Sequence, residues 1–347
     1  MRFLFVGGGT GGHLTPAIGL AEGLEANGHE TMFLLSGRKV EQAYFDDGRA
    51  CASMEFENSK LPKLLALIGA MRHARRFARD YQPDAVIALG GASSAAALGI
   101  GRRRHCPLVL LEGNFVVGRS VKLMEIFADR TLTMFADTAE QCRNGFAMGP
   151  VSRKSLSATA SAQARQTLGL DPKLPTLLVM GGSQGARDVN NVAIALLADL
   201  QRLGWQLLAL VGTGKAADLR AAQHAAGVPG LVLEHCTEMG LAYSAANFAL
   251  TRGGASSMGE IWMHRLPSAV FPYPYHKDRQ QELNAGALQP GVLCFNQLNE
   301  DVLERLRACL ASADQRAAMA SALAASDPGD GRAEGARVLA EIAGRKA

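Results

Sequence analysis

The chain has 347 residues, of which 48% are apolar and 20% are charged, and its formal net charge is +4. This length exceeds what a single core usually fills, so two domains are expected, and the nearly balanced charge gives no indication of a nucleic-acid partner. No apolar run approaches the roughly 18 residues of a transmembrane helix, and the first apolar run is too short for a signal peptide, so a cytoplasmic protein is expected. Its 6 scattered cysteines contain no CxxC pair, which predicts reduced thiols.

The first elements of the chain predict a strand, a glycine-rich loop, a helix and a second strand. The apolar run at residues 3–6 leads directly into GGGTGGH at residues 7–13. A helix is expected at residues 16–27 and a strand at residues 31–35. This order is a βαβ unit, and its continuous apolar strands are typical of a parallel sheet that is covered on both faces.

The glycine spacing in this first loop is compatible with more than one function. Gly7, Gly9 and Gly12 fit the GxGxxG fingerprint of a dinucleotide site, but Arg38 stands where that fingerprint requires an acid. Because an arginine can accommodate the 2′-phosphate of NADP, an NADP-dependent dehydrogenase remains an alternative. His13 favours other chemistry, since a histidine at a helix start can act as a general base, although a capping or core histidine is also possible.

Residues 60–80 predict a helix with two apolar faces. The stripe that suits a protein core consists of Leu67, Ala70, Met71, Ala74, Ala78 and Tyr81. The apolar residues elsewhere on the helix are Leu61, Leu64, Leu65 and Ile68, in line with Arg72, Arg75, Arg76 and Arg79, to which Arg102, Arg103 and Arg104 add charge. An apolar patch beside a basic band predicts docking on an anionic membrane surface. The alternative is that Gly69 breaks the helix and the leucines belong to the core.

The second half of the chain repeats the plan of the first. An apolar strand at residues 176–180 leads into GGSQGAR at residues 181–187, followed by a helix through Val192 and Leu200 and a strand at residues 206–211. A strand, a glycine loop, a helix and a strand therefore occur in the same order in both halves, which indicates that the architecture is duplicated.

The sequence GGASS also occurs in both halves. It follows a predicted strand at residues 85–89 as residues 90–94, and a second at residues 248–251 as residues 253–257. Two doubly wound parallel-sheet α/β domains are therefore predicted, with a hinge in the helix-breaking stretch 149–175. The ligand site is expected between them, at the carboxyl ends of the strands.

The second GGASS belongs to a longer run, GGASSMGE at residues 253–260, which suits a nucleotide sugar. A glycine loop that opens a helix offers backbone N–H groups to phosphate, Ser256 and Ser257 add hydroxyls, and Glu260 can reach ribose. A capping box formed by Ser257 and Glu260 is the structural alternative. The chain contains no Asp-x-Asp motif, so no metal site is expected and the charge of the leaving group must meet helix N-termini and an arginine.

Four motifs together resemble the MurG family of glycosyltransferases. They are GGGTGGH at residues 7–13, GGSQGAR at residues 181–187, GGASSMGE at residues 253–260 and HKDRQQELNA at residues 276–285. The resemblance extends in the same order from Met1 to about Asp301. It implies the GT-B fold, in which two Rossmann-like domains face a cleft, and inverting transfer of N-acetylglucosamine from UDP-GlcNAc to the MurNAc 4-hydroxyl of lipid I. The product is lipid II, a precursor of peptidoglycan needed for cell shape and division.

The resemblance also implies a division of labour along the chain. Residues 1–155 correspond to the acceptor and membrane-binding domain, on which a C-terminal helix at about residues 329–347 packs, and residues 156–328 correspond to the UDP-sugar domain. No cofactor is implied. A lipid-linked acceptor implies a peripheral protein on the cytoplasmic face of the plasma membrane, with cell-wall synthesis proteins as possible partners.

The functional residues of the family fall on matching positions of this chain. His13 is implied as the base for the acceptor hydroxyl, and Asn114 lies near the transferred sugar. Arg153 is implied to contact the nucleotide, Cys236 to hold uracil through main-chain atoms, and Glu260 to bind the ribose. The other implied donor contacts are Thr10, Gly11, Gly12, Ser183, Ala255, Ser256, Ser257, Met258, Gly259, Gln280 and Gln281.

Three segments depart from the family pattern: GGASSAAAL at residues 90–98, EGN at residues 112–114 and GPVSR at residues 149–153. All three lie in or near the acceptor half, so they bear on the acceptor more than on the donor. A glycolipid glycosyltransferase and a UDP-GlcNAc epimerase are therefore alternatives within the GT-B class. A nucleotide-sugar sensor without catalytic activity is a further alternative.

Overall fold

The computed structural model describes residues 1–9, 11–42, 44–45, 48–54, 56, 59, 62–101, 106–182, 185–275, 278–326 and 329–345. The chain divides into unit 1, Met1–Lys154 with Pro328–Ala347, and unit 2, Ser155–Asp327. The crossing from unit 1 to unit 2 falls inside the stretch 149–175 that the sequence marks as a hinge.

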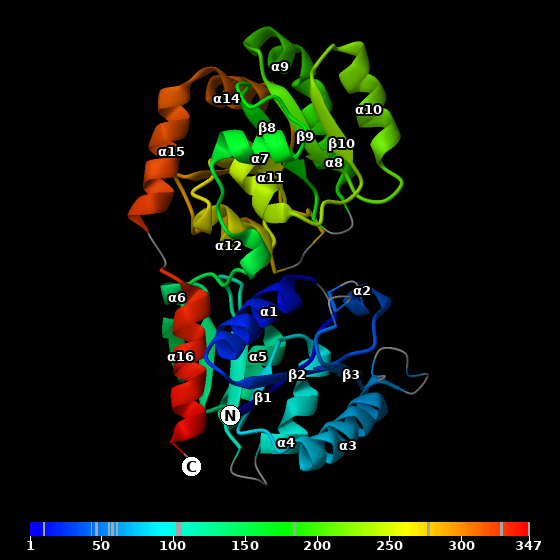
Figure 1. The fold of residues 1–347 in the computed structure, drawn as a ribbon, viewed down its shortest axis with the longest axis vertical. Coiled ribbons are helices and arrows are strands. Elements are labelled where there is room, and N and C mark those ends of the chain that lie inside the picture. Colours follow the sequence, from blue (N-terminus) through cyan, green and yellow to red (C-terminus); the bar gives the residue numbers. More distant parts are fainter. Residues whose placement is uncertain are drawn as a thin grey trace. The chain divides into compact units, whose positions relative to one another are not determined.

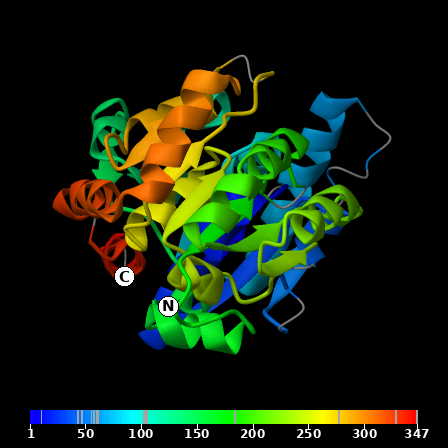
Figure 2. The same ribbon diagram turned by 90° about the horizontal axis from the view of Figure 1, so that it is seen from above.

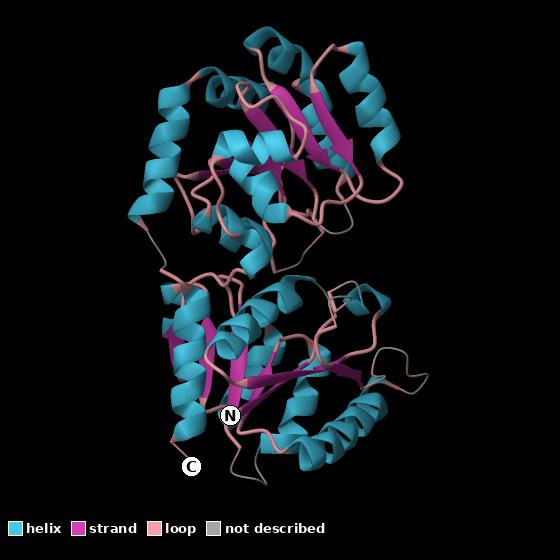
Figure 3. Ribbon diagram, viewed as in Figure 1, coloured by secondary structure: helices cyan, strands magenta, loops and turns pink. Residues whose placement is uncertain are grey.

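Unit 1 contains a seven-stranded sheet in the order β3-β2-β1-β4-β5-β6-β7, and all of its strand pairs are parallel (Figure 3). Its strands are β1 Arg2–Val6, β2 Glu30–Leu35, β3 Cys51–Ser53, β4 Ala85–Ala88, β5 Leu108–Glu112, β6 Arg130–Thr133 and β7 Gly145–Ala147. Because side chains alternate along a strand, Phe3 and Phe5 enter one core, whereas Leu4 and Val6 enter the other. This double burial explains why β1 is continuously apolar.

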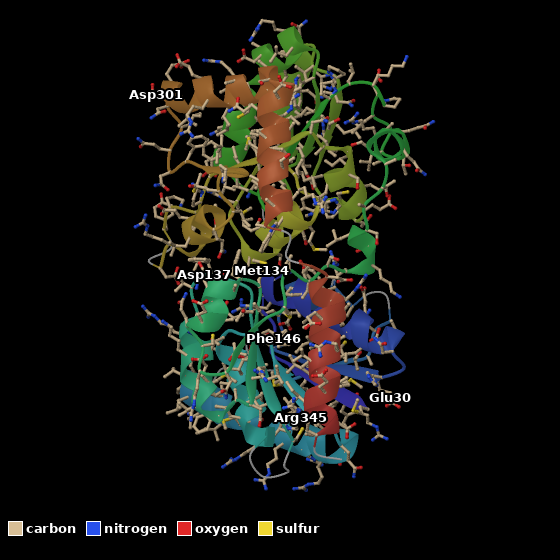
Figure 4. The ribbon with its side chains drawn as sticks, turned by 90° about the vertical axis from the view of Figure 1, so that its left-hand side faces the viewer. Glu30, Met134, Asp137, Phe146, Asp301 and Arg345 are labelled. Atoms are coloured by element: carbon tan, nitrogen blue, oxygen red, sulfur yellow. The ribbon has the colours of Figure 1, made fainter. Side chains whose placement is uncertain are left out.

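Helices cover both faces of the sheet of unit 1 (Figure 1). On one face α1 (Gly11–Ala26) packs against α16 (Gly331–Gly344), and Arg345 follows the end of α16 in Figure 4. On the other face lie α3 (Lys63–Tyr81) and α5 (Arg119–Met124). The shorter elements are α2 Lys39–Gln42, η1 Ala92–Ala97, α4 Leu98–Gly101, η2 Glu125–Phe127, α6 Ala136–Glu140 and η3 Lys154–Leu156, the last of which crosses into unit 2.

Unit 2 contains a six-stranded parallel sheet in the order β10-β9-β8-β11-β12-β13. Its strands are β8 Thr176–Met180, β9 Gln206–Leu210, β10 Gly230–Leu233, β11 Phe248–Thr251, β12 Ser268–Val270 and β13 Val292–Cys294. The helices around it, which Figure 2 shows from above, are α7 Ser161–Thr167, α8 Arg187–Ala195, α9 Leu197–Leu203, α10 Ala216–Ala225, α11 Met239–Ala245, α12 Ala255–Met263, α13 Gln280–Gly286, α14 Glu300–Ala311 and α15 Ala313–Ala325.

The predicted fold class, two parallel-sheet α/β units, is confirmed, but two helices differ from the prediction. The first helix begins at Gly11 and contains Pro16, rather than starting there. Pro16 is the sixth residue of α1, where it has no N–H to donate to the carbonyl four residues earlier, so it interrupts the hydrogen-bond ladder of the helix without ending it. The helix expected through Val192 and Leu200 is divided at Leu196 into α8 and α9.

Candidate active site

His13 lies in the first turn of α1, where the two glycine loops of unit 1 meet. A Cβ placed on Gly90 would lie 3.3 Å from Cδ2 of His13, and one placed on Gly91 would lie 3.5 Å from its Cε1. Burial lowers the pKa of His13 below its ordinary value of 6.5, a hydrogen bond with the backbone of Gly8 opposes this, and the charge of Arg38 lowers it further. The imidazole is therefore mainly neutral at pH 7 and able to accept a proton.

The first glycine loop is held by Glu41, a residue that sequence reasoning missed. Its carboxylate is buried and accepts hydrogen bonds from Ser36 Oγ at 2.5 Å and from the backbone N–H groups of Gly37 and Arg38 at 2.9 and 3.1 Å. A Cβ on Gly8 would collide with this carboxylate. The only signal in the sequence is an acid at the start of a short helix after β2, which is too common to single out.

Asn114 follows β5, the neighbour of the strand that carries the first GGASS loop, and so lies at the same edge of the sheet. Its backbone N–H and its Nδ2 donate to Glu112 Oε1 at 2.9 and 3.0 Å, and Gly118 N–H donates to Glu112 Oε2 at 2.7 Å. Burial raises the pKa of Glu112, although these donors oppose the shift. The EGN motif is thus a compact turn organised by a buried glutamate, which orients Asn114.

Arg153 belongs to unit 1 and packs beside the first glycine loop through Tyr44. Its guanidinium lies over the Tyr44 ring, 5.9 Å from the centroid, and a Cβ on Gly11 would collide with the Tyr44 hydroxyl. The Nε of Arg153 is buried and has no hydrogen-bond partner among the described residues. Arg153 therefore places a positive charge near the start of α1.

In unit 2 the run GGASSMGE forms the start of α12. Gly254 is the N-cap residue, and Ala255, Ser256 and Ser257 make up the first turn, whose amides lie outside the hydrogen-bond ladder of the helix. Met258 differs, because its N–H donates to the carbonyl of Gly254 at 2.9 Å and its side chain is fully buried. The polar groups that α12 can present to a ligand therefore come from the first turn and from Glu260.

Glu260 does not form the capping box considered as an alternative. The helix begins before Ser257, and Glu260 Oε2 instead accepts a hydrogen bond of 2.5 Å from the hydroxyl of Tyr243 in α11. Sequence spacing could not reveal this contact, since Tyr243 lies on a different helix.

Arg252, directly before the GGASS loop of unit 2, connects three loops at the carboxyl edge of the sheet. Its Nη1 donates to the carbonyls of Phe271 and Pro272 at 2.7 and 2.9 Å, and its Nη2 pairs with Asp188 Oδ1 at 2.6 Å. These partners follow β12 and begin α8. The position of an arginine between a buried strand and two glycines could have identified Arg252 from the sequence.

The described part of the motif HKDRQQELNA, residues 278–285, packs against the same loop through Gln281 and Asn284, whereas His276 and Lys277 lie outside the described residues. Asn284, fully buried, donates from Nδ2 to the carbonyl of Gly253 at 3.0 Å, and a Cβ on Gly253 would collide with the carbonyl of Gln281. Gln281 Oε1 accepts from Tyr273 N–H at 2.9 Å, which fixes the orientation of its side-chain amide. A pocket of about 300 Å³ lies beside it, lined by Pro272, Tyr273, Pro274, Arg279, Gln281, Glu282 and Asn296.

For the remaining predicted site residues the structure gives mainly their places in the fold. Gln280 opens α13, Gly12 lies in the first turn of α1, and Cys236 lies between β10 and α11, where burial raises the pKa of its thiol. Thr10 and Ser183 lie outside the described residues. Within the described residues no group of three or more His, Cys, Asp or Glu side chains is arranged to hold a metal ion.

The segment predicted to dock on a membrane forms the continuous helix α3, so Gly69 does not break it. The exposed fractions of Leu64, Leu65 and Ile68 are 70%, 51% and 38%. The buried residues are Ala66, Ala70, Ala74 and Ala78, whereas Leu67, Met71 and Tyr81 are only partly buried.

Exposed arginines continue the surface of α3: Arg72, Arg75, Arg76 and Arg79. Leu123 and Ile126, which the sequence did not single out, are also exposed, and α5 and α3 both pack on η1. Leu61 and Arg102 to Arg104 lie outside the described residues. None of the helices in the described ranges is both long and apolar enough to cross a bilayer.

Comparison with known proteins shows which family has this architecture. Residues 3–133 match the glycosyltransferase family 28 N-terminal domain, and residues 176–332 match the family 28 C-terminal domain. A relative from Nocardioides sp. is 32% identical, with 99% of this chain and 98% of the relative covered, and one from Thermobifida fusca is 31% identical, with 93% and 89% covered. Both are named UDP-N-acetylglucosamine–N-acetylmuramyl-(pentapeptide) pyrophosphoryl-undecaprenol N-acetylglucosamine transferase.

Solved structures show the same fold at lower identity. MurG of Acinetobacter baumannii superposes with a TM-score of 0.78 at 20% identity, covering 98% of this chain and 99% of that one. UDP-GlcNAc 2-epimerase of Neisseria meningitidis has a TM-score of 0.70 at 12% identity, with 99% of both chains covered.

Two Rossmann-like units that match the N- and C-terminal domains of glycosyltransferase family 28 place the chain in the GT-B class of glycosyltransferases. More narrowly, the chain belongs to glycosyltransferase family 28 and, within it, to the MurG family. This membership excludes the NADP-dependent dehydrogenase that the GxGxxG spacing had left open.

Proposed function

We propose that the protein transfers N-acetylglucosamine from UDP-GlcNAc to the MurNAc 4-hydroxyl of undecaprenyl-diphosphate-MurNAc-pentapeptide, with inversion at the anomeric carbon. The observation that carries the proposal is the match to relatives of this named activity over nearly the full length of both chains. The paired glycine loops support it, because one lies against a neutral histidine and the other opens a helix toward an anion.

His13 is the proposed general base. A neutral imidazole in the first turn of α1 can take the proton of the acceptor hydroxyl as that oxygen attacks the anomeric carbon and the bond to UDP breaks. Asn114, fixed by Glu112, orients the transferred sugar through its side-chain amide. Glu112 is thus a positioning residue for Asn114.

Unit 2 holds the donor. The first-turn amides of α12 and the hydroxyls of Ser256 and Ser257 meet the diphosphate, where negative charge develops as UDP leaves. Glu260 accepts hydrogen bonds from the ribose, and Gln280 and the NH₂ group of Gln281 meet the sugar hydroxyls. Gly11, Gly12 and Arg153 add amides and positive charge.

The proposal includes neither a metal ion nor an organic cofactor. Metal-dependent nucleotide-sugar sites commonly clamp the cation with carboxylates, and the sequence contains no Asp-x-Asp motif for this purpose. Backbone dipoles and Arg153 take over the neutralisation of the diphosphate.

We also propose that α3 docks on the anionic cytoplasmic face of the plasma membrane. Its exposed Leu64, Leu65 and Ile68 insert among the lipids, and the neighbouring arginines pair with phosphate headgroups. A triple Leu64→Ser, Leu65→Ser, Ile68→Ser variant should bind vesicles containing anionic lipid at least about tenfold more weakly while transfer to a water-soluble acceptor analogue is kept. Unchanged vesicle binding would contradict this part of the proposal.

The experiment that tests the function is a transfer assay with lipid I and UDP-GlcNAc. Formation of lipid II by the wild-type protein, and its loss in His13→Ala, is the expected result. Conversion of UDP-GlcNAc without an acceptor would indicate an epimerase. Binding of UDP-GlcNAc without consumption by any acceptor would indicate a sensor, and both outcomes would overturn the proposal.

A further inference from the structure

Tyr243 is a buried tyrosine whose hydroxyl is directed at the proposed ribose-binding carboxylate. Its ring is 2% exposed, and its hydroxyl donates to Glu260 Oε2 at 2.5 Å. Buried tyrosines normally find a hydrogen-bond partner, but most often this is a backbone carbonyl or water, not a carboxylate that is also needed by a ligand. The short distance is typical of a charge-assisted hydrogen bond.

The Tyr243 ring is itself held in one place. It stacks on His264 with ring centroids 5.1 Å apart and an interplanar angle of 24°. His264 Nε2 lies 3.0 Å from the carbonyl of Leu156, and burial lowers the pKa of His264, so the neutral ring donates from Nε2 to that carbonyl. Leu156 in turn packs on Gly240, where a Cβ would lie 3.0 Å from its Cα. The support therefore extends from the start of unit 2 to the hydroxyl of Tyr243.

A glutamate that must recognise ribose benefits from being fixed before the ligand arrives. Its side chain has several rotatable bonds, and restricting them on binding would reduce affinity. A carboxylate offers about four lone-pair positions, and the hydrogen bond from Tyr243 takes one of them, on Oε2. Tyr243 can thus restrain Glu260 without occupying it fully.

We propose that Tyr243 is a positioning residue that holds Glu260 in the conformation that accepts the ribose hydroxyls, and that this contact makes the site prefer ribonucleotides to deoxyribonucleotides. The inference deepens the proposed function and rests on its assignment of Glu260 to the ribose. The competing view is that Glu260 merely satisfies a buried tyrosine and that Tyr243 serves only the packing of α11.

The test is calorimetric titration of UDP and of 2′,3′-dideoxy-UDP, which lacks both hydroxyls, into the wild-type protein and Tyr243→Phe. The variant should bind UDP about tenfold more weakly, the usual effect of losing a hydrogen bond to a charged group, and bind the dideoxy analogue within about twofold of wild type. In the transfer assay its KM for UDP-GlcNAc should rise by a similar factor while kcat stays within about twofold. Tyr81→Phe, a partly buried tyrosine of unit 1 whose hydroxyl lies 3.5 Å from the carbonyl of Phe3, is the matched control and should bind both ligands like the wild type.

Equal weakening of both ligands in Tyr243→Phe would assign the residue a structural role and overturn the inference, as would unchanged binding of UDP. If Tyr243→Phe does not fold, Glu260→Gln provides the reciprocal test, because it should lose the same preference for UDP over the dideoxy analogue. A wild-type protein that binds UDP but does not discriminate against the analogue sinks this inference while leaving glycosyl transfer intact. A wild-type protein that binds neither UDP nor UDP-GlcNAc sinks the proposed function itself.

Discussion

The two copies of GGASS share five letters but form different structures. In unit 1, Gly90 and Gly91 have φ values of 88° and 73°, the segment continues as the short 3₁₀ helix η1, and Ser93 and Ser94 are buried. In unit 2, Gly254 has a φ of −64° and caps the regular helix α12. The glycine backbone of the first copy therefore packs against the ring of His13, whereas the second copy begins a helix whose first-turn amides can bind an anion.

The difference shows that a glycine-led loop takes its role from what packs against it. The loop of unit 1 lies against an imidazole, and the serine Ser94 turns inward to donate to the carbonyl of Gly91 at 2.7 Å. The loop of unit 2 lies against the backbone of Gln281 and the amide of Asn284, so its serines remain partly exposed. This contrast fits the proposal that the first copy supports catalysis and the second binds the donor.

The largest effect is expected from His13→Ala, which removes the base that the first copy supports. Transfer should slow by about 10² to 10⁴-fold, the usual contribution of a positioned general base. Turnover with saturating UDP-GlcNAc and lipid I measures it, and His224→Ala, an exposed histidine of α10, is the control and should retain activity. If the turnover of His13→Ala stayed within a few-fold of wild type, the first copy would have no role in catalysis through His13.

The second glycine of each copy gives a direct contrast in stability. Gly91→Ala should destabilise the protein by about 1–2 kcal/mol, since an alanine is strained in the left-handed region that Gly91 occupies. Gly254→Ala should cost less, about 0.5–1 kcal/mol, because its φ is ordinary and no atom lies within 4 Å of the added Cβ, so that only the preference of the N-cap for glycine over alanine is lost. Urea unfolding of both variants measures the difference, and equal losses would mean that the two copies share one backbone conformation.

A smaller effect is expected in the pH profile. Because the pKa of His13 is lowered below 6.5, its base form predominates from pH 6.5 upward, and kcat/KM should fall only as the pH decreases through that lowered value. At pH 6.5 the loss should be less than about twofold. A profile that has already fallen by half at pH 6.5 or above would show that the burial of His13 does not control its protonation.

The smallest effect is expected from chelation. If the amides of α12 and Arg153 neutralise the diphosphate, excess EDTA should leave the transfer rate unchanged within error. A rate that collapses with EDTA and returns with Mg²⁺ or Mn²⁺ would contradict a donor site in which the amides of α12 and Arg153 neutralise the diphosphate without a metal ion.

Much of this architecture could be predicted from the sequence because its signals are local. Buried strands such as residues 3–6 and 176–180 are continuous apolar runs, and each leads into a glycine loop before a helix. The roles of His13 and Glu260 were suggested by their positions in the sequence close after a glycine loop. Each residue lies in the helix that the loop opens, so the short spacing in the sequence is also a short distance in space. Resemblance to the MurG family then added residues that local patterns alone do not identify.

The parts that could not be predicted depend on contacts between distant segments. Tyr243 reaches Glu260, Arg252 reaches Phe271, and Glu41 supports Gly8, each from a different element. In α3 the pattern of apolar residues predicted that Leu67 and Met71 are core residues, but both are only partly buried. The close approach of α3 to η1 and α4 leaves room in the buried face only for small alanines. Hydrophobicity does not encode how near two elements pack.

Titration of UDP into the wild-type protein, His13→Ala and Glu260→Ala tests most directly whether the two glycine-loop copies divide catalysis and donor binding. We predict that Glu260→Ala weakens UDP binding by about tenfold or more, whereas His13→Ala binds UDP within about twofold of wild type although its turnover is lost. Equal weakening of UDP binding in the two variants would contradict the division.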